Sequence, residues 1–408
     1  MLEPLRYTES DMKRLTVIHR TMTGLACTTA AAMLGLSVRQ VFRLKAKLRK
    51  QGDSGIIHGN RGRRPANAKP AELRRYVLDL HRRQYRKYNA CHFAEALEEE
   101  HHVKLSRETV RRWFRAAGIP AKRGHRSRSN HRRRRLRSAR FGELLFLDGS
   151  PHRWLGENRP SLTLILATDD ATGKPLRGLF VDQENLNGCL EVLYHVFRRH
   201  GLPKALYLDR AGQFTTTRHG GVHRFQRDDK PTHFEVAMKH LGIETIFAHS
   251  PQARGRGERI NGSFQDRLVA ELDHHGIRDP GTATRYLNRH FIPRYARRFG
   301  VPSRKPESAF DPAPAGLDLR TVLCARTQRA VTNDNTISHK GRTYQLLPSN
   351  RIISLAGAKV EVQDWFDGSI HVFHPQTGEI PLRKLPPTPK VTRRRRCTAY
   401  DAFAVHSL

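Results

Sequence analysis

The sequence predicts a multidomain α/β protein: an all-α N-terminal part, a mixed β-sheet core in the middle, and a small β-barrel near the C-terminal end. Three patterns support this fold class. Apolar residues follow helical spacing up to residue 121, and short apolar strands alternate with helices between residues 141 and 312. Short alternating strands with glycine turns then occupy residues 331–388.

Changes in composition give the expected domain boundaries. Two segments rich in Gly, Pro, Asn or Arg lack apolar periodicity and are interpreted as linkers, although the second one also resembles a localisation signal or an RNA-binding tract. The expected order is a first helix-turn-helix domain (1–58), a linker (59–70), a second helix-turn-helix domain (71–121), a basic linker (122–140), the core (141–312), a linker (313–330), the barrel (331–388) and a basic tail (389–408).

Charge indicates the kind of partner. The 408 residues carry a formal net charge of +36, and the isoelectric point is about 11.0. Residues 1–140 contain 35 Lys and Arg against 11 Asp and Glu, whereas residues 141–320 contain 26 against 21. This distribution favours a polyanionic partner, DNA or RNA, over a small-molecule substrate. It also leaves the middle of the chain with the composition of a folded enzyme domain.

Cysteine usage and hydropathy indicate the compartment. Five cysteines, Cys27, Cys91, Cys189, Cys324 and Cys397, are scattered and form no CxxC pair. This pattern argues for a reducing environment and against structural zinc. We found no apolar run of about 18 residues and no signal-peptide core at the N-terminus, so we expect a cytoplasmic protein with no membrane partner.

Residues 24–50 have the pattern of a helix-turn-helix. Ser37 is a suitable N-cap, and Val38, Val41, Phe42 and Leu44 or Lys45 follow helical spacing on the second helix. The alternative is a surface helix with solvated charges. In a major groove, the outward side chains that could contact bases and phosphates are Arg39, Gln40, Arg43 and Lys47.

A second unit of the same kind ends with residues 103–119. Ser106 begins its last helix, with Val110, Trp113 and Phe114 expected to face inward. The arginines expected to face outward are Arg107, Arg111, Arg112 and Arg115. Two such units in tandem indicate a long DNA site more strongly than one unit would.

The middle of the chain reads as a mixed sheet with helices on its faces. Strands are expected at 143–148, 161–170, 176–182, 204–209 and 243–248, and helices at 185–201 and 232–242. A further helix should begin with Ser250 as N-cap and Pro251 as its first residue. Its buried stripe is expected to contain Ile260, Phe264, Leu268 and Leu272.

Three carboxylates lie where chemistry could occur. Asp148 and Asp209 each end a predicted strand, so they should project into the crevice where open sheets bind ligands. Glu258 flanks the buried stripe of the following helix, with Asn261 and Gln265 one and two turns later. Each carboxylate alone could equally be a turn former or a helix cap.

Together these carboxylates suit metal-dependent phosphoryl transfer. Hard oxygen ligands favour Mg²⁺ or Mn²⁺, and two ions could act on the attacking and the leaving oxygen. Nearby basic residues, Arg254, Arg256 and Arg259, could hold the nucleic-acid backbone.

Other polar residues compete for this role. Asp169 and Asp170 are followed by Ala-Thr-Gly, which is typical of a hairpin turn. His152 and His249 could orient a phosphate, although chance proximity is the simpler interpretation in a chain with 23 histidines.

The segments LDGSPHRW, YLDRAGQF and HSPQARGRGERINGSFQDRL resemble the integrase core of DDE transposases, most closely the ISNCY group of bacterial insertion-sequence transposases. The resemblance implies an RNase H-like catalytic core with Asp148, Asp209 and Glu258 as the metal-binding triad. The sequence departs from the wider integrase pattern in having Arg210 after the second aspartate, and in the polar insertion TTTRHGGVHRFQRDDK before the glutamate.

The expected function is therefore that of a DNA transposase, which binds the terminal inverted repeats of its element and catalyses DNA cleavage and strand transfer. Its partners would be double-stranded DNA, as element ends and target, and further copies of itself in a homodimer or larger assembly, near the bacterial nucleoid. One alternative is a catalytically inactive, sequence-specific DNA-binding regulator derived from a transposase. A basic RNA-associated structural protein would explain the charge but not the carboxylates.

Overall fold

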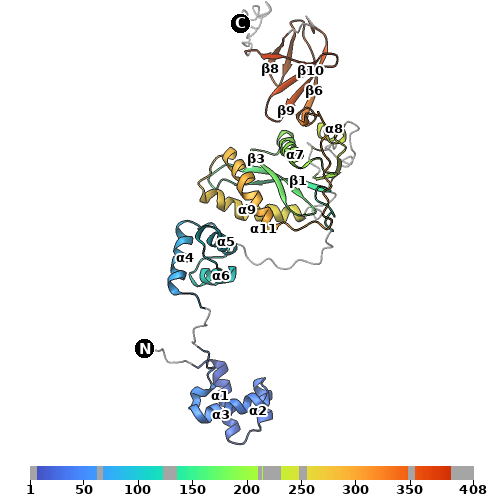
Figure 1. The fold of residues 1–408 in the computed structure, drawn as a ribbon. Coiled ribbons are helices and arrows are strands. Elements are labelled where there is room, and N and C mark those ends of the chain that lie inside the picture. The colour runs from blue at the N-terminus through green and yellow to red at the C-terminus, as the bar shows by residue number, and fades with distance from the viewer. Residues whose placement is uncertain are drawn as a thin grey trace, which may run out of the picture. The chain divides into compact units, whose positions relative to one another are not determined.

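The computed structural model describes residues 7–61, 68–122, 136–209, 214, 231–247, 255–347 and 354–386, without the side chains of residues 255 and 256. The chain divides into two compact units, residues 1–79 and 80–408. Figure 1 labels the helices and strands of both units.

The first unit is a small helical domain built from α1 (Glu9–Met22), α2 (Cys27–Leu34), α3 (Val38–Gln51) and the short 3₁₀ helix η1 (Gly52–Ile56). Gly35 ends α2 with φ of 62°, a left-handed conformation that glycine adopts at little cost. The predicted N-cap of α3 is confirmed, because the Ser37 side chain accepts a hydrogen bond from the Gln40 backbone N–H. Ile18 and Val41 lie at the centre of the buried core.

The predicted inward position of Phe42 is wrong. Phe42 is 56% exposed, and the buried positions of α3 are Val41 and Leu48, two turns apart. A three-helix domain of this size buries only a narrow stripe of each helix, so the wider apolar face in the sequence is left partly in solvent.

Helix α4 (Ala71–Arg83) crosses the division between the units, and α5 (Ala90–His101) and α6 (Arg107–Ala116) follow it. The predicted cap at Ser106 is confirmed by a hydrogen bond from the Thr109 N–H. The expected inward side chains Val110 and Phe114 are buried, whereas Trp113 is only half-buried.

The core of the second unit is a mixed five-stranded sheet with the order β3-β2-β1-β4-β5. All five expected strands are present: β1 (Leu144–His152), β2 (Leu162–Asp169), β3 (Pro175–Val181), β4 (Ala205–Leu208) and β5 (Glu244–Phe247). The prediction that Asp148 ends its strand is wrong, because β1 continues to His152 and keeps pairing with β2 beyond Asp148. β1, β2 and β3 pair antiparallel, and β4 pairs parallel with both β1 and β5. The connecting helices are α7 (Leu186–His200), α8 (His233–His240), α9 (Gly255–His274), α10 (Pro280–Tyr286), the π-helical turn η4 (Leu287–Phe291) and α11 (Ile292–Phe299).

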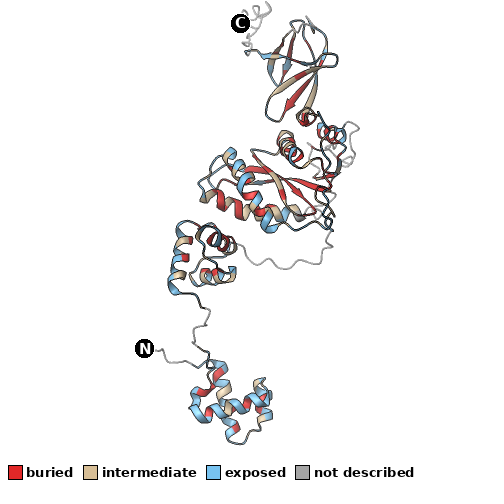
Figure 2. Ribbon diagram, in the orientation of Figure 1, coloured by how far each residue is buried: buried red, intermediate tan, exposed pale blue. Residues whose placement is uncertain are grey.

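Helices pack on both faces of this sheet, which explains why its strands are largely buried (Figure 2). One hydrophobic core joins the sheet to α7 and α8, and a second joins it to α9, η4 and α11. The predicted stripe of α9 is confirmed: Phe264, Leu268 and Leu272 are fully buried in the second core, and Ile260 packs against it. The N-cap expected at Ser250 lies outside the described residues.

The C-terminal strands do not form the expected closed barrel within the described residues. After α12 (Leu319–Val322) they make two open antiparallel sheets that share one apolar core. The four-stranded sheet contains β6 (Cys324–Ala330), β9 (Lys359–Trp365), β10 (Ile370–His374) and β11 (Gly378–Ile380), and the three-stranded sheet contains β7 (Thr336–His339), β8 (Arg342–Leu346) and β12 (Leu382–Lys384). None of the described helices combines the length and the apolar character needed to cross a membrane.

Candidate active site

The first candidate carboxylate, Asp148, lies on β1, and the second, Asp209, directly follows the neighbouring strand β4. β1 and β4 are parallel and pair Leu144 with Ala205 and Phe146 with Tyr207. If the same register continues for two residues, Asp148 lies beside Asp209, which directly follows β4. Adjacent strands are about 4.8 Å apart, so the two carboxylates can share one ligand.

Helix α9 covers Asp148 with polar side chains. The Asn261 amide Nδ2 donates a hydrogen bond of 2.9 Å to Asp148 Oδ2, and Gln265 Nε2 donates one of 3.1 Å to Ser150 Oγ. Four residues of an α-helix rise about 6 Å, and two residues of a strand rise about 6.6 Å, so the two bonds hold α9 along β1 in one register.

The start of α9 approaches the same carboxylate. A Cβ atom added to Gly257 would lie 3.3 Å from Asp148 Oδ2. Glu258 is the next residue and is exposed to solvent. The first turn of α9 thus carries the third carboxylate past the strand that bears the first.

The three carboxylates do not form a complete metal site in this structure. Among the residues described, no group of three His, Cys, Asp or Glu side chains is placed so that it could hold a metal ion. Asp148 and Asp209 are hard oxygen donors, and their donor chemistry fits Mg²⁺ or Mn²⁺. Glu258 is exposed to solvent and does not join the two aspartates in such a group. One oxygen of Asp148 already accepts a hydrogen bond from Asn261.

A fourth carboxylate, Glu184, lies close to this edge of the sheet and was missed by the sequence analysis. A Cβ atom on Gly149, the residue after Asp148, would clash with the Glu184 carboxylate. Burial raises the pKa of the Cys189 thiol well above its usual range, and the charges of Glu184 and Asp209 raise it further, so both carboxylates lie near Cys189. Glu184 ends no strand, so no local feature of the sequence singles it out.

The competing residues have structural roles. Buried Asp169 accepts hydrogen bonds from the backbone N–H groups of Gly142 and Thr172, and buried Asp170 accepts from that of Ser138. The predicted hairpin turn is therefore confirmed.

The two candidate histidines remain without an assigned role. The His152 ring packs edge-on against Trp154 with centroids 5.3 Å apart, and burial lowers the pKa of this histidine. His249 lies outside the described residues.

The basic residues expected to contact DNA divide into three groups. On α3, Arg39, Arg43 and Lys47 are exposed, while the Gln40 side chain is held by Ser37 at the helix start. On α6, Arg107, Arg111 and Arg112 are exposed, and Arg111 and Arg112 both pair with Glu108. Arg259 is exposed on α9, Arg254 lies outside the described residues, and nothing is described of the Arg256 side chain.

Comparison with known proteins gives consistent relatives. No protein-family model matches the chain. A Sinorhizobium fredii protein described as transposase y4bF is 33% identical over 367 residues, which cover 89% of this chain and 79% of the relative. The transposase for insertion sequence IS1202 of Streptococcus pneumoniae is 30% identical over 379 residues, covering 84% and 79%.

Solved structures give only weak similarities. The HTLV-2 integrase catalytic core domain in complex with magnesium has a TM-score of 0.28 and 13% identity, covering 37% of this chain and 86% of that chain. The intasome of simian T-cell lymphotropic virus with the PP2A regulatory subunit B56 gamma has a TM-score of 0.30 and 13% identity, covering 76% and 100%. These scores are too low to establish a shared fold. The sequence relatives are decisive: the chain belongs to the family of DNA transposases that includes y4bF and the IS1202 transposase.

Proposed function

We propose that this transposase cleaves and joins DNA at the edge of its sheet where β1, β4 and the first turn of α9 meet, with Asp148, Asp209 and Glu258 as the metal-binding triad of an RNase H-like core. The observation that supports the proposal is the parallel pairing of β1 with β4 together with the hydrogen bond from Asn261 of α9 to Asp148. Continued by two residues, the register of this pairing would put Asp148 level with Asp209. The strand order β3-β2-β1-β4-β5, with only β4 and β5 parallel to β1, supports the fold assignment.

The reaction is a pair of phosphoryl transfers. A water oxygen attacks the phosphodiester at the element end and forms one P–O bond, while the bond to the 3′ oxygen breaks and leaves a 3′-hydroxyl. That hydroxyl then attacks a phosphodiester of the target and displaces its 3′ oxygen. Bound Mg²⁺ or Mn²⁺, with two ions proposed, would supply activation of the attacking oxygen and charge stabilisation at the leaving one.

In this reaction, side chains of the protein hold the metal ions and the DNA and orient the carboxylate ligands. Asp148 and Asp209 offer carboxylate oxygens to the cations, and Asn261 fixes the orientation of the Asp148 carboxylate. Completing the site requires Glu258 to swing toward the two aspartates. Catalytic hydrogen bonds and ligands often tighten only in the substrate complex. The exposed Arg259, with Arg254 and Arg256, would contact the DNA backbone beside the scissile phosphate.

Recognition of the element ends is assigned to the exposed basic residues of α3 and α6. Arg39, Arg43 and Lys47 on α3, and Arg107, Arg111 and Arg112 on α6, are placed on solvent-exposed helix surfaces where they could meet phosphates and base edges. Gln40 is kept as a weaker candidate because its side chain already caps α3. Joining two ends also requires two active sites, so a homodimer or larger assembly in the bacterial cytoplasm is proposed. The domain boundaries expected from the sequence are proposed with it.

The alternative of an inactive DNA-binding regulator is not favoured. Both sequence relatives are described as transposases, and all three candidate carboxylates are present in this chain. A degenerate relative would be free to lose them.

The decisive test is Asp148→Asn. The amide can still accept the hydrogen bond from Asn261, so the fold is kept while one negative ligand is lost. We expect Mg²⁺-dependent cleavage and strand transfer on a duplex with candidate ends to disappear, and end binding in a gel-shift assay to stay at the wild-type level. The matched control is Glu244→Gln, which neutralises an exposed carboxylate at the opposite end of the same sheet and should retain activity. Joining of DNA by Asp148→Asn would refute the triad.

A further inference from the structure

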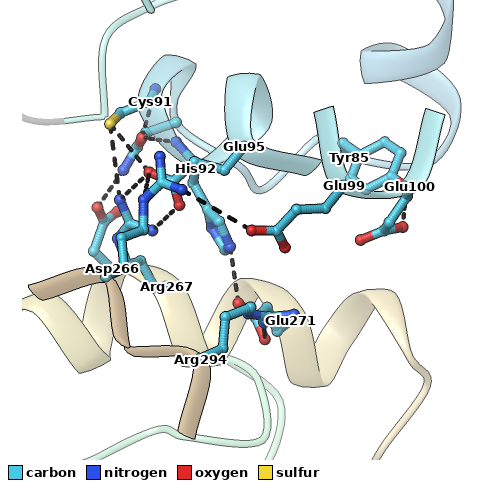
Figure 3. A network of polar contacts seen from close by, with 12 residues as sticks. Tyr85, Cys91, His92, Glu95, Glu99, Glu100, Asp266, Arg267, Glu271 and Arg294 are labelled. Atoms are coloured by element: carbon cyan, nitrogen blue, oxygen red, sulfur yellow. Dashed lines mark hydrogen bonds and ion pairs between the residues drawn. The ribbon is translucent and has the colours of Figure 1, made fainter. Parts of the chain in front are cut away.

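Helix α9 has a second polar face, which is turned toward α5 and is far richer in charged contacts than the face toward β1. Four charged or polar side chains meet between α5 and α9, and all are buried: His92, Glu95, Arg267 and Glu271, with residue exposures of 5%, 7%, 9% and 3%. Figure 3 shows them between the helices of the N-terminal side and those of the core. Buried charges of this kind are rare unless they are paired.

The first half of this network centres on Glu95. Arg267 donates two hydrogen bonds to the Glu95 carboxylate, of 2.5 Å from Nη1 and 3.0 Å from Nη2. Arg298 of α11 approaches the same carboxylate with its Nε 3.0 Å away. Burial alone would raise the pKa of Glu95, but the Arg267 hydrogen bonds and the two positive charges outweigh it and lower the pKa. The carboxylate is therefore ionised and held by two arginines from the core.

The second half centres on Glu271. The His92 Nε2 of α5 lies 2.9 Å from Glu271 Oε1, and the Tyr286 hydroxyl donates a 2.8 Å hydrogen bond to Oε2. Arg294 of α11 forms an ion pair with the same carboxylate. Thus Glu95 of α5 pairs with two arginines of the core, and Glu271 of the core pairs with His92 of α5.

Two smaller contacts extend the interface at either end of α5. Asn89, which caps α5, also donates a hydrogen bond to Asp266 of α9. The Tyr85 ring stacks on His274 with centroids 4.5 Å apart and an interplanar angle of 22°. The contacts therefore run along α9 from residue 266 to residue 274, about two turns.

These contacts lie on the same helix as the hydrogen bonds to β1. Asn261 and Gln265 attach one side of this helix to β1, and Arg267 and Glu271 attach another side to α5. A helix held on two sides has little freedom to rotate or slide. Because Glu258 stands only nine residues before Arg267 on the same helix, its placement depends on the network.

We propose that α5 braces α9, with Arg267 and Glu271 as positioning residues that fix where α9 presents Glu258 and Asn261 to Asp148. This inference rests on the proposed function of those three residues. Helix α6, which carries Arg107, Arg111 and Arg112, packs against α5. The helix proposed to read DNA and the helix proposed to carry a catalytic carboxylate are therefore joined through α5 within one polypeptide.

The test separates positioning from DNA binding. Arg267→Met removes the partner of Glu95 and leaves a buried carboxylate short of one cation, so α9 should loosen from α5. We expect the single-turnover cleavage rate at saturating DNA to fall about 10- to 100-fold, as for other small displacements of reacting groups, while the Kd for the ends changes little. Amide hydrogen exchange of residues 255–262 should become faster. The double variant Glu95→Met/Arg267→Met, which removes both charges, should recover most of the rate.

Two further variants keep the test decisive. Arg278→Met is the matched control, because it removes a partly exposed ion pair with Asp273 near the end of the same helix. Lys87 still pairs with Asp273 in this variant, so rate and exchange should stay unchanged. If Arg267→Met does not fold, Asp266→Ala removes the Asn89 contact without leaving a buried charge, and should accelerate exchange of residues 255–262 more mildly.

Unchanged exchange of residues 255–262 in Arg267→Met, or in Asp266→Ala where that variant has to decide, overturns the brace. A cleavage rate equal to that of Arg278→Met in a folded Arg267→Met also overturns it. If the wild-type protein cleaves no DNA, the proposed function fails, and the exchange measurement alone decides the brace.

Discussion

The pair α2–α3 and the pair α5–α6 have the same sequence pattern, yet they differ in what surrounds them. Both consist of a short helix, a tight turn and a Ser-capped second helix with exposed basic residues. The α2–α3 pair completes its core with α1 and η1 inside the first compact unit. The α5–α6 pair belongs to the second unit and shares buried charges with α9.

The turns show the same contrast on a smaller scale. Gly35 supplies the left-handed residue after α2, whereas His102 supplies it after α5 with φ of 55°. A non-glycine residue in this region costs about 1 kcal/mol. The α5–α6 pair therefore contains a strained residue at His102, and its contacts with neighbouring elements add stability. Similar helical pairs can thus belong either to a separate module or to the unit that contains the sheet.

The largest expected effect comes from truncating a large buried side chain in the core around each pair. Phe93 is fully buried and contacts the rings of His81, Tyr85 and Phe114, so Phe93→Ala should cost about 3–5 kcal/mol of unfolding free energy. Because Phe93 lies on α5, the loss should spread to α9. Amide exchange followed by mass spectrometry should show faster exchange in residues 90–116 and also in residues 255–274.

Ile18→Ala is the matching change in the first unit. Ile18 is also fully buried, and its truncation should cost about 2–5 kcal/mol. Faster exchange should be confined to residues 9–56. If both variants left α9 untouched, the two pairs would be equally independent and the contrast between them would fail.

Much of this architecture is predictable because it depends on apolar periodicity. The start of β1, all of β2 and the stripe of Phe264, Leu268 and Leu272 are buried as the sequence indicates, since their spacing leaves one arrangement that removes them from water. Asp148 and Asp209 could be singled out because each follows a short apolar strand. The Ser37 and Ser106 caps are local signals that need no tertiary context.

Charged residues that become buried are not predictable in this way. Glu95, Arg267 and Glu271 read as solvated positions on amphipathic helices, because nothing local shows that another helix will cover them. The brace was therefore missed. Glu184 was missed for another reason, because it lies between β3 and α7 and ends no strand. The C-terminal strands were recognised individually, but whether sheets close into a barrel depends on pairing between distant edges, which periodicity does not encode.

A smaller effect is expected on DNA binding, where the two pairs can be compared directly. Arg39→Ala/Arg43→Ala and Arg111→Ala/Arg112→Ala should each weaken end binding and reduce the slope of log K against log salt by about 0.9 for each DNA phosphate that the variant no longer neutralises. The variant Arg111→Ala/Arg112→Ala should lose less affinity for the DNA ends than the α3 variant. Arg111 and Arg112 already form ion pairs with Glu108 and must exchange that partner for DNA. Kd measured at several salt concentrations, with a random duplex as control, gives both slopes. An unchanged slope would remove that helix from end recognition.

The smallest effect concerns acid stability, and it should differ between the two pairs. Burial lowers the pKa of His81 and of His92, which lie beside Phe114 and Glu271. A base whose folded pKa is depressed is charged first in the unfolded chain, so stability falls as pH drops below the unfolded value of about 6.5.

In the first unit, an acid has a shifted pKa: Asp11, which is buried on α1. Hydrogen bonds from Arg61 and Thr8 hold the Asp11 pKa well below its usual range, so its contribution is lost only as pH falls below about 4. The protein can be equilibrated at a series of lower pH values and then labelled by a pulse of amide exchange at one fixed pH. This measurement should show that α5 opens at a higher pH than α1. His92→Gln keeps an amide that can donate to Glu271 without titrating, and should move the opening of α5 to lower pH. Simultaneous opening of α1 and α5 would show that the buried histidines do not set the difference.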